Sequence, residues 1–539
     1  MIMLYKLIVP STLFLAVFLR FFNLNSLPPS LNWDEVSLGY NAYSILKTGK
    51  DEWGQFMPLS FRAYGEYKLP AYIYLDVPFI ALFGLNEWGV RIPSAILGII
   101  TCIFIYLILK ELSQGSSMAV VGFFIAATAP WLIILSRIAL EANLALTFTT
   151  AAMYFFLKEK PNSILASLLL GLSVFAYNSG RVVSPLLLIL SAVILWKKFK
   201  SNIPQTLISS TIFMIFFSMA IPLAFLQDSS ARYKLTAILD QGAINQINEL
   251  RGKNLYPPAL NNIIFNRVTY FSSHALKNYI SHFNPNFIFI NGGSNYQFSV
   301  PGSPLMFLVL FPFLIYGIWA AFKSNDKRWQ LVILWLLLTP IPAAITRDSP
   351  HALRSLMIAI PVILLTALGI DKIVSLNLKY KLLLTTGVSI LVAIFLVTFL
   401  QNYGVNYPKD YSWSWQYGYK QAVDFVDQNG EEYSKVYITK KYGEPHEFLL
   451  FYKQVNPQEY INDKNLVRFP QSDWWWVDRF DKYFFLNDWE VKDKALCDTD
   501  VEKCLLVTSP GNYPKEVKLL QTINFLNGTP AFDIVDFNI

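Results

Sequence analysis

The stretch that decides the fold is "LYKLIVPSTLFLAVFLRFFNLNSLPPSLNWDE", residues 4–35. Its first part, residues 4–22, is almost wholly apolar and has the length of about 20 residues that a bilayer span requires. No small-residue cleavage pattern follows it, so we expect a retained anchor rather than a signal peptide. Two adjacent carboxylates, Asp34 and Glu35, follow shortly after the end of this span.

The composition extends this pattern to the whole chain. Of its 539 residues, 54% are hydrophobic and 15% are charged, whereas soluble proteins carry about 25% charged residues. We predict a mainly α, polytopic membrane protein with about 11 transmembrane helices and a C-terminal extracytoplasmic α/β domain. The predicted spans are 4–22, 89–109, 118–135, 139–157, 163–179, 182–196, 205–226, 304–322, 329–345, 353–370 and 382–400.

Basic residues in the short loops indicate the orientation. They fall on one side of the membrane if the N-terminus is cytoplasmic, as the positive-inside bias requires. This places residues 23–88, 227–303 and 401–539 outside the cytoplasm, in a multi-pass protein of the cell membrane. The net charge of +7 then reflects topology, and no nucleic-acid partner is predicted. The loop residues concerned are Lys110, Lys158, Lys160, Lys197, Lys198, Lys200, Lys323, Lys327, Arg328, Lys372, Lys379 and Lys381.

The chain divides into a transmembrane domain, residues 1–400, and an extracytoplasmic domain, residues 401–539. In the second, a helix ending near Gly430 alternates with the strand patterns "SKVYIT", "KYFFLN", "KCLLVTS" and "EVKLLQTI" and the helical "EPHEFLLFYK", which favours an α/β layer. The loop 23–88 contains a helix that ends at Gly49 and an apolar helix that we expect to lie at the membrane interface.

The cysteine and histidine residues indicate little about the chemistry of the protein. Cys497 and Cys504 lie in the outer domain, where an oxidising compartment would permit a disulfide, but the spacing is also compatible with two free thiols. Cys102 lies in a span and is interpreted as packing. The four His are scattered and no paired metal motif occurs, so no cofactor is predicted and a divalent metal is not indicated.

Ionisable residues gather at the outer ends of the spans, although they come from remote parts of the chain. Placing a charged group at membrane depth costs free energy, so such groups occur mainly where they form ion pairs or have a function. Several cations near one or two carboxylates indicate a phosphate ligand and a carboxylate that removes a proton. The candidates are Asp34, Glu35, Lys68, Arg137, Glu141, Arg181, Arg347, His351 and Arg354.

Most of these residues also have a structural interpretation. Asp34 and Glu35 could begin a helix, and Lys68 could extend to the interface. Arg137 and Glu141 have the spacing of a helical ion pair. The remaining alternatives are a short-loop charge at Arg181, a satisfied interfacial histidine at His351, and structural cations at Arg347 and Arg354 despite their outer position.

Four stretches carry a resemblance to a known family: "NWDE" (32–35), "YKLPAYIYLDVPFIALFGLNEWGVRIPSAILGI" (67–99), "SRIALEANLALTF" (136–148) and "PHALRSLMIAIPV" (350–362). The chain resembles the polytopic GT-C type glycosyltransferases that use polyprenyl-phosphate sugars. These include the dolichyl-phosphate-mannose protein mannosyltransferases and the bacterial aminoarabinose transferases that modify lipid A.

The resemblance implies roles for individual residues. Asp34 would be the general base with Glu35 as its acidic neighbour, and Lys68 would hold the lipid phosphate. Glu141 matches the position of a second acid, whereas Arg91 is interpreted as structural. His351 and Arg354 would contact the phosphate of the leaving group.

Two departures from the family pattern lie at the start of the second stretch. Leu69-Pro70 replaces Pro-Pro, and Tyr67 stands where an acid is usual, which weakens the assignment of the phosphate contact. "DWWWVD" (473–478) is interpreted as aromatic packing or a sugar-stacking surface.

The predicted function is that of an inverting glycosyltransferase that moves a sugar from a polyprenyl-phosphate donor to an acceptor hydroxyl on a protein, lipid or glycan at the outer membrane face. Its partners are that donor, the acceptor and membrane lipids. A transporter or flippase of lipid-linked sugars and a non-catalytic glycan receptor are the alternatives. The enzyme requires Asp34 in one cavity with Lys68, Glu141 and Arg354, whereas a transporter would place polar groups near the middle of the bilayer.

Overall fold

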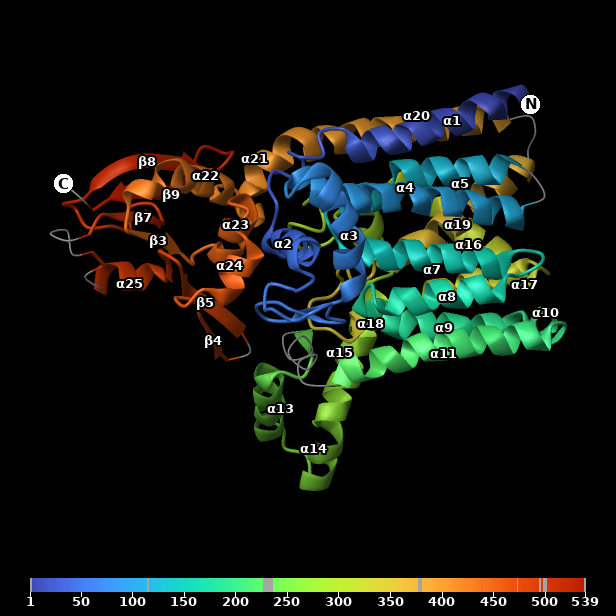
Figure 1. Ribbon diagram of the computed structural model, residues 1–539. Helices are drawn as coiled ribbons and strands as arrows, with labels where there is room; N and C mark the ends of the chain where they lie inside the picture. The colour runs from blue at the N-terminus through green and yellow to red at the C-terminus, as the bar shows by residue number, and fades with distance from the viewer. Residues whose placement is uncertain are drawn as a thin grey trace. The chain divides into compact units, whose positions relative to one another are not determined.

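The protein is seen in a computed structural model that describes residues 2–113, 116–225, 236–376, 381–472, 474–493, 496–497 and 502–537 (Figure 1). It forms two compact units. The first, here the helical unit, comprises Met1–Arg20, Ile96–Ser136 and Glu141–Phe399; the second, the mixed unit, comprises Phe21–Ala95, Arg137–Leu140 and Leu400–Ile539. Asp473, Lys379 and residues 227–235, which figure in the predictions above, lie outside the described residues.

Most helices of the helical unit are apolar, with α13 and α15 as polar exceptions, and several of them pack pairwise. Helix α8 packs on α7, α9 and α11, and α16 packs on α19. The last pair is in backbone contact, because a Cβ at Gly317 would lie 1.8 Å from the Leu365 carbonyl oxygen. The helices are α1 (Ile2–Phe21), α4 (Glu87–Leu112), α5 (Ser116–Thr128), α6 (Pro130–Ser136), α7 (Glu141–Leu157), α8 (Ser163–Val174), α9 (Asn178–Ile194), α10 (Trp196–Lys200), α11 (Ile203–Phe225), α13 (Gln241–Lys253), α14 (Pro258–Ile264), α15 (Arg267–Ser281), α16 (Phe311–Lys323), α17 (Lys327–Leu338), α18 (Ile341–Ala344), α19 (Ala359–Leu376) and α20 (Lys381–Gln401).

Each of the predicted spans contains a helix, but the number of membrane crossings stays a prediction. Within the described residues, four helices are long and apolar enough to cross a bilayer: Glu87–Leu112, Ile203–Leu223, Leu356–Ser375 and Thr385–Trp415. A pair bent by 53°, Ser117–Thr128 with Pro130–Ser136, adds a fifth if it is one broken span. Shorter apolar helices account for several others, so the multi-span character is confirmed at this coarser level.

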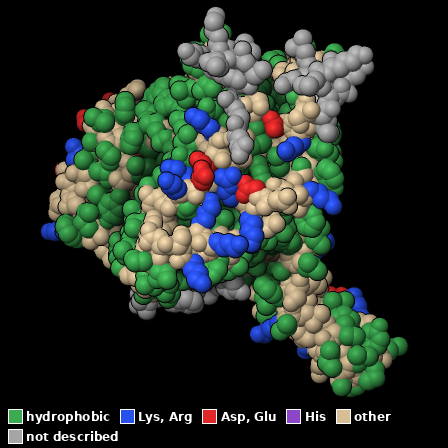
Figure 2. Space-filling model, turned by 90° about the vertical axis from the view of Figure 1, so that its right-hand side faces the viewer, with side chains coloured by type: hydrophobic (Ala, Val, Ile, Leu, Met, Phe, Trp, Pro, Cys, Tyr) green, Lys and Arg blue, Asp and Glu red, His purple; other side chains and the backbone are tan. Residues whose placement is uncertain are grey.

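Basic side chains gather on the face of the helical unit that Figure 2 presents. Lys197 and Lys198 from one predicted short loop line a cavity of about 610 Å³ together with Lys327 and Arg328 from another. Two loops that the charge pattern assigned to one side therefore do lie together.

The amino-terminal part of the mixed unit contains the two predicted helices of the first outer loop. Helix α2 (Trp33–Thr48) begins with a capping box, in which the Asn32 side chain accepts from the Glu35 N–H and Glu35 accepts from the Asn32 N–H, and it ends at Gly49 with φ 70°. A short hairpin, β1 (Phe61–Arg62) with β2 (Tyr67–Lys68), precedes α3 (Pro70–Phe83).

The rest of the mixed unit is a seven-stranded sheet in the order β4-β5-β6-β3-β7-β9-β8. Strand β3 is parallel to β6 and β7, and the other neighbours are antiparallel. The strands are β3 (Lys435–Thr439), β4 (Val467–Gln471), β5 (Trp474–Phe480), β6 (Tyr483–Leu486), β7 (Cys504–Thr508), β8 (Lys518–Asn524) and β9 (Pro530–Asp536); the helices are α21 (Tyr407–Tyr411), α22 (Tyr419–Asn429), α23 (Pro445–Tyr452), α24 (Pro457–Asn462) and α25 (Asp488–Asp493). The predicted strands correspond to β3, β6, β7 and β8, whereas β4, β5 and β9 were missed.

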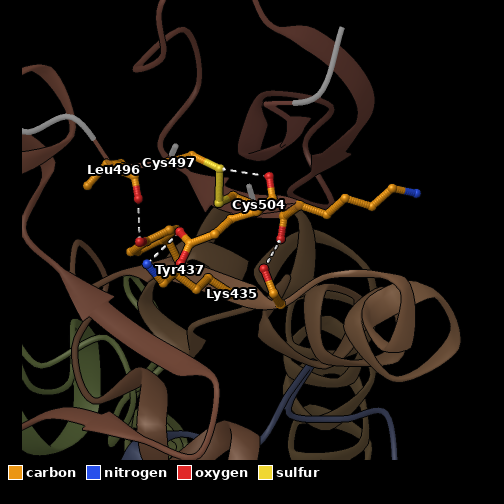
Figure 3. The surroundings of a disulfide bond; sticks show 8 residues. Lys435, Tyr437, Leu496, Cys497 and Cys504 are labelled. Carbon is orange, nitrogen blue, oxygen red and sulfur yellow. Dashed lines mark hydrogen bonds and ion pairs between the residues drawn. A yellow bond between two sulfur atoms is a disulfide. The ribbon is translucent and has the colours of Figure 1, made fainter. Parts of the chain in front are cut away.

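A disulfide joins Cys497 to Cys504 (Figure 3). Cys504 belongs to a buried cluster of the mixed unit that also contains Tyr437, Leu506 and Val535. The Tyr437 hydroxyl donates to the Leu496 carbonyl at 2.5 Å, which holds the segment before Cys497 against this core. Of the two alternatives left open by the sequence, the structure contains the bridge.

Candidate active site

The first outer loop brings a carboxylate and an ammonium group into contact. Asp34 lies in the first turn of α2, and Lys68 ends the hairpin strand β2. The Lys68 Nζ is 2.5 Å from Asp34 Oδ1, and the Tyr64 hydroxyl donates to the same oxygen at 2.6 Å. The Asp34 side chain is 29% exposed, whereas that of Lys68 is 2% exposed. The carboxylate is therefore partly open to solvent, and two buried donors hold it in place.

Tyr64 is suited to this role because it keeps its proton. Its side chain is buried, and burial together with the neighbouring Asp34 charge raises the pKa of the hydroxyl well above its ordinary value of 10. The hydroxyl is thus protonated at neutral pH and donates to Asp34 there. The sequence pattern did not point to Tyr64, although it stands only four residues before Lys68.

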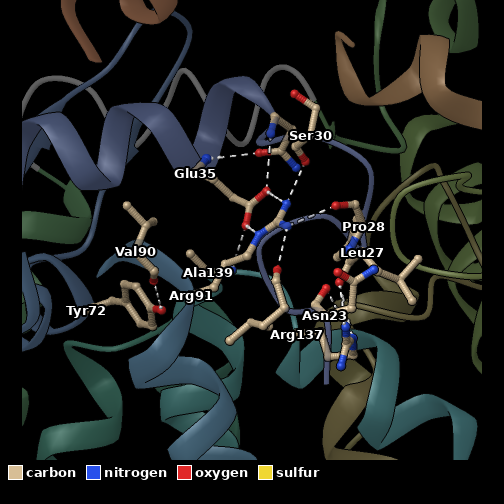
Figure 4. A network of polar contacts seen from close by, with 12 residues as sticks. Asn23, Leu27, Pro28, Ser30, Glu35, Tyr72, Val90, Arg91, Arg137 and Ala139 are labelled. Atoms are coloured by element: carbon tan, nitrogen blue, oxygen red, sulfur yellow. Dashed lines mark hydrogen bonds and ion pairs between the residues drawn. The ribbon is translucent and has the colours of Figure 1, made fainter. Parts of the chain in front are cut away.

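Glu35 does not share the exposure of its neighbour. Its carboxylate is fully buried and forms a two-point contact with Arg91, Nε to Oε1 at 2.8 Å and Nη2 to Oε2 at 3.0 Å (Figure 4). It also accepts from the Ala139 N–H at 3.0 Å. Arg91 completes its bonds with the carbonyls of Leu24, Pro28 and Ser30. The geometry places Glu35 in a buried ion pair and supports the structural interpretation of Arg91, whereas the predicted catalytic role of Glu35 stays a prediction.

Arg137 is likewise engaged by backbone rather than exposed to a ligand. Its guanidinium donates to the carbonyls of Phe22, Asn23 and Leu27 at 2.8–3.2 Å, and the residue is 2% exposed. Figure 4 shows it beside the turn that leaves α1. The Asn23 carbonyl also accepts from the Leu27 N–H at 3.0 Å, so Arg137 adds side-chain donors to a turn that the backbone closes as well. Arg137 therefore holds this turn, and its predicted phosphate contact stays a prediction.

The helical unit holds a second group of predicted residues in the segment before α19. Arg354 donates to the Thr346 hydroxyl at 3.0 Å and lies 3.6 Å from Asp348. His351 is 9% exposed, and its Nδ1 accepts from the Arg354 N–H at 3.4 Å. Arg347 is half exposed and pairs with Asp240 at 3.3 Å. His351 and Arg354 are thus neighbours, as the sequence stretch required.

Glu141 and Arg181 begin helices of the same unit. Glu141 is the first residue of α7, and Arg181 lies in the first turn of α9, where it donates to Asn178 Oδ1 at 3.2 Å. Asp34 and Lys68 belong to the mixed unit, whereas Glu141, Arg181, Arg347, His351 and Arg354 belong to the helical unit. The convergence of the two sets in one cavity stays a prediction.

A group of buried acids in the mixed unit was missed by the sequence. Glu52, Glu444 and Glu447 are each at most 2% exposed, and one oxygen of each has no hydrogen-bond partner. Burial raises the pKa of Glu52 and of Glu444 to about 7 and that of Glu447 well above 4.5. His446, between the last two, is neutral because burial lowers its pKa to about 3. No local pattern distinguishes these acids from surface residues.

Comparison with known proteins agrees with the predicted resemblance. Residues 11–229 match the family model described as dolichyl-phosphate-mannose-protein mannosyltransferase. No curated protein matches the chain in a sequence search. The family match confirms the predicted glycosyltransferase class.

Solved structures of similar fold cover almost the entire chain. The crystal structure of ArnT from Cupriavidus metallidurans bound to undecaprenyl phosphate aligns with 98% of this chain and 97% of that chain, at 12% identity and a TM-score of 0.56. The same protein in the apo state aligns with 99% and 97%, at 12% identity and a TM-score of 0.53. The chain therefore has the fold of ArnT, and the predicted fold type is confirmed.

Proposed function

We propose that this protein is an inverting glycosyltransferase that moves a sugar from a polyprenyl-phosphate donor to an acceptor hydroxyl at the outer membrane face. The observation that carries the proposal is the exposed Asp34 carboxylate, held by Lys68 and Tyr64 on an oxygen that both donors share. The family model that matches residues 11–229 describes a transferase, so a transporter is not favoured.

Asp34 acts as the general base in this proposal. Its carboxylate accepts the proton of an acceptor hydroxyl, whose oxygen attacks the anomeric carbon from the face opposite the leaving phosphate. General-base assistance of this kind contributes about 10²–10⁴-fold to the rate. Lys68 orients the carboxylate, and because an ammonium has three donors it can also face the donor phosphate. Glu35 fixes α2 through Arg91 and is proposed as a structural support for Asp34.

The cations of the helical unit stabilise the departing lipid phosphate. Arg354 and His351 are adjacent on one loop, Arg347 lies nearby, and Arg181 opens α9. An Arg fork binds phosphate with two parallel hydrogen bonds, and charge stabilisation at a leaving group is commonly the largest catalytic contribution. Glu141 is proposed to contact the sugar or the acceptor. The donor is lipid-linked, in line with the undecaprenyl phosphate in the ArnT structure of the same fold.

The topology forms part of the proposal. Residues 1–400 are the transmembrane domain with about 11 spans and a cytoplasmic N-terminus, and residues 401–539 are extracytoplasmic, as are the loops 23–88 and 227–303. The acceptor is a protein, lipid or glycan. A protease or a membrane-impermeant lysine reagent added to intact cells tests this arrangement, because only the extracytoplasmic segments should react.

The decisive experiment is a transfer assay with purified protein and a panel of polyprenyl-phosphate sugars. The Asp34→Asn variant should lose about 10²–10⁴-fold in transfer rate while its circular dichroism matches that of the wild type. Asp427→Asn, which removes an exposed carboxylate paired with Lys453, is the matched control and should retain full activity. Full transfer by Asp34→Asn would remove Asp34 from the role of base.

A further inference from the structure

Strand β5 of the sheet lies against the loop that carries the candidate base. The Trp474 ring stacks on the Tyr64 ring at a centroid distance of 5.2 Å and an interplanar angle of 30°. The Trp475 N–H donates to the Tyr64 carbonyl at 2.5 Å. Both partners belong to the mixed unit, so residues about 400 positions apart in the chain form one contact.

The stacking requires a glycine next to Tyr64. A Cβ at Gly65 would lie 2.2 Å from the Trp474 ring, closer than real Cβ atoms approach. The backbone at residue 65 therefore permits the indole to cover the neighbouring tyrosine. Gly65 has a packing requirement here, which is distinct from the need for a left-handed backbone.

Trp474 is itself fixed by a buried acid. Its indole N–H donates to Glu444 Oε1 at 2.5 Å, and Glu444 is 1% exposed. The preceding residue, Gly443, packs on the Trp33 ring, because a Cβ at this position would lie 2.2 Å from that ring. The segment 443–444 thus contacts the residue before Asp34 directly and reaches Asp34 a second time through Trp474 and Tyr64.

We propose that Glu444 and Trp474 are positioning residues, which hold the Tyr64 hydroxyl on Asp34 and thereby couple the β5 edge of the sheet to the protonation of the candidate base. This rests on the proposed function, because it assigns Asp34 the role of base. A hydrogen bond donated to a carboxylate favours its charged form. The position of the Tyr64 hydroxyl therefore controls the pH above which Asp34 is ionised and can accept a proton from the acceptor hydroxyl. Aromatic packing alone would stabilise the unit without affecting that pH.

The test is the pH dependence of transfer in variants that separate the hydroxyl from the ring. Tyr64→Phe keeps the stack and removes only the donor, so the acid limb of the pH–rate profile should move upward by about 1–2 pH units. Trp474→Leu should move the limb in the same direction, because Tyr64 loses its support. Glu444→Gln keeps the acceptor oxygen and should stay near the wild type, whereas Glu444→Leu should behave as Trp474→Leu.

Two control variants match these changes. Tyr74→Phe removes a hydroxyl that donates to the Pro58 carbonyl in the same loop, and Trp476→Leu removes the indole two residues along β5, which lies under Lys440. Because the Trp476 ring packs on Trp474 at a centroid distance of 6.1 Å, Trp476→Leu shows only how far a disturbed neighbour of Trp474 affects the limb, and Trp489→Leu, at an indole of α25 that is 68% exposed, is the tryptophan control. Tyr74→Phe and Trp489→Leu should leave the acid limb in place. An unmoved limb in Tyr64→Phe overturns the inference, and a limb that moves in Tyr64→Phe but not in Trp474→Leu overturns the part assigned to β5.

A second measurement distinguishes failure of this inference from failure of the proposed function. The unfolding midpoints of Tyr64→Phe, Asp34→Asn and the double variant should be non-additive, since directly bonded residues couple. If the effects on the unfolding midpoint are non-additive but the wild type transfers no sugar from any donor, the proposed function is refuted and the contact between Tyr64 and Asp34 is retained. Additive midpoints together with Asp34-dependent transfer would refute the contact and leave the function standing.

Discussion

Replacing Glu35 by Ala should destabilise the mixed unit strongly. The change leaves the Arg91 guanidinium, which is fully buried, without its counter-ion and removes contacts of 2.8 and 3.0 Å. It also leaves the Ala139 N–H without its 3.0 Å acceptor. Removing one partner of a buried ion pair costs about 3–5 kcal/mol. For a unit of about 200 residues this corresponds to an unfolding midpoint lower by roughly 6–20 °C.

The assay is thermal unfolding of the purified protein in detergent, followed by tryptophan fluorescence. Arg91→Ala should cost a similar amount, and the double variant should cost less than the sum of the two by about 0.5–3 kcal/mol. Glu432→Ala, at an exposed residue 4.0 Å from Lys503, is the control and should change stability by less than about 0.5 kcal/mol. A Glu35→Ala protein that unfolds at the wild-type temperature would refute the assignment of Glu35 as a structural anchor.

Three further outcomes follow from the described contacts. Arg354→Ala should raise the KM for the lipid-linked donor by about 10–100-fold with little change for the acceptor, and an unchanged donor dependence would exclude it from the phosphate site. Burial raises the pKa of Glu52 to about 7 in the folded protein, against 4.5 ordinarily, so ionisation of this acid lowers the free energy of unfolding as the pH rises between those values. The unfolding midpoint of Glu52→Gln should therefore exceed that of the wild type by a margin that grows from about pH 5 to pH 8, and a constant margin would contradict this. Reduction should expose two alkylatable thiols and lower the stability of the mixed unit by about 2–4 kcal/mol, as should Cys497→Ser, whereas labelling of Cys497 or Cys504 without reductant would contradict the bridge.

Sequence reasoning located the helices and the loop of the candidate base because both depend on short-range patterns. Apolar runs predicted where helices occur, and the position of Asp34 after the first of them made it the candidate base. The same reasoning placed Lys68 nearby, since both lie in one loop. The structure adds that Lys68 bonds Asp34 directly, a contact set by the β1–β2 hairpin rather than by spacing.

The contacts that the sequence did not reveal depend on long-range packing. Arg137 was grouped with phosphate ligands by its position at a span end, and its partners include carbonyls of a turn more than 100 residues earlier. Glu35 is adjacent to Asp34 but points to Arg91, which the sequence alone could not pair with it. Glu52 and Glu444 look like surface acids until the sheet and the first loop pack together.

The mixed unit is assembled from the two ends of the chain, and this sets the timing of its biosynthesis. Gly39 contacts Phe451, and the Tyr40 hydroxyl bonds the Val455 carbonyl, so α2 meets these partners only after about 400 further residues have been made. At roughly 5–20 residues per second the ribosome needs about 20–80 s to supply them. During that interval the loop that carries Asp34 lacks the Trp474 ring that packs on Tyr64. The nascent chain is therefore open to proteolysis and to incorrect contacts at this loop until the segment that contains Trp474 has been made.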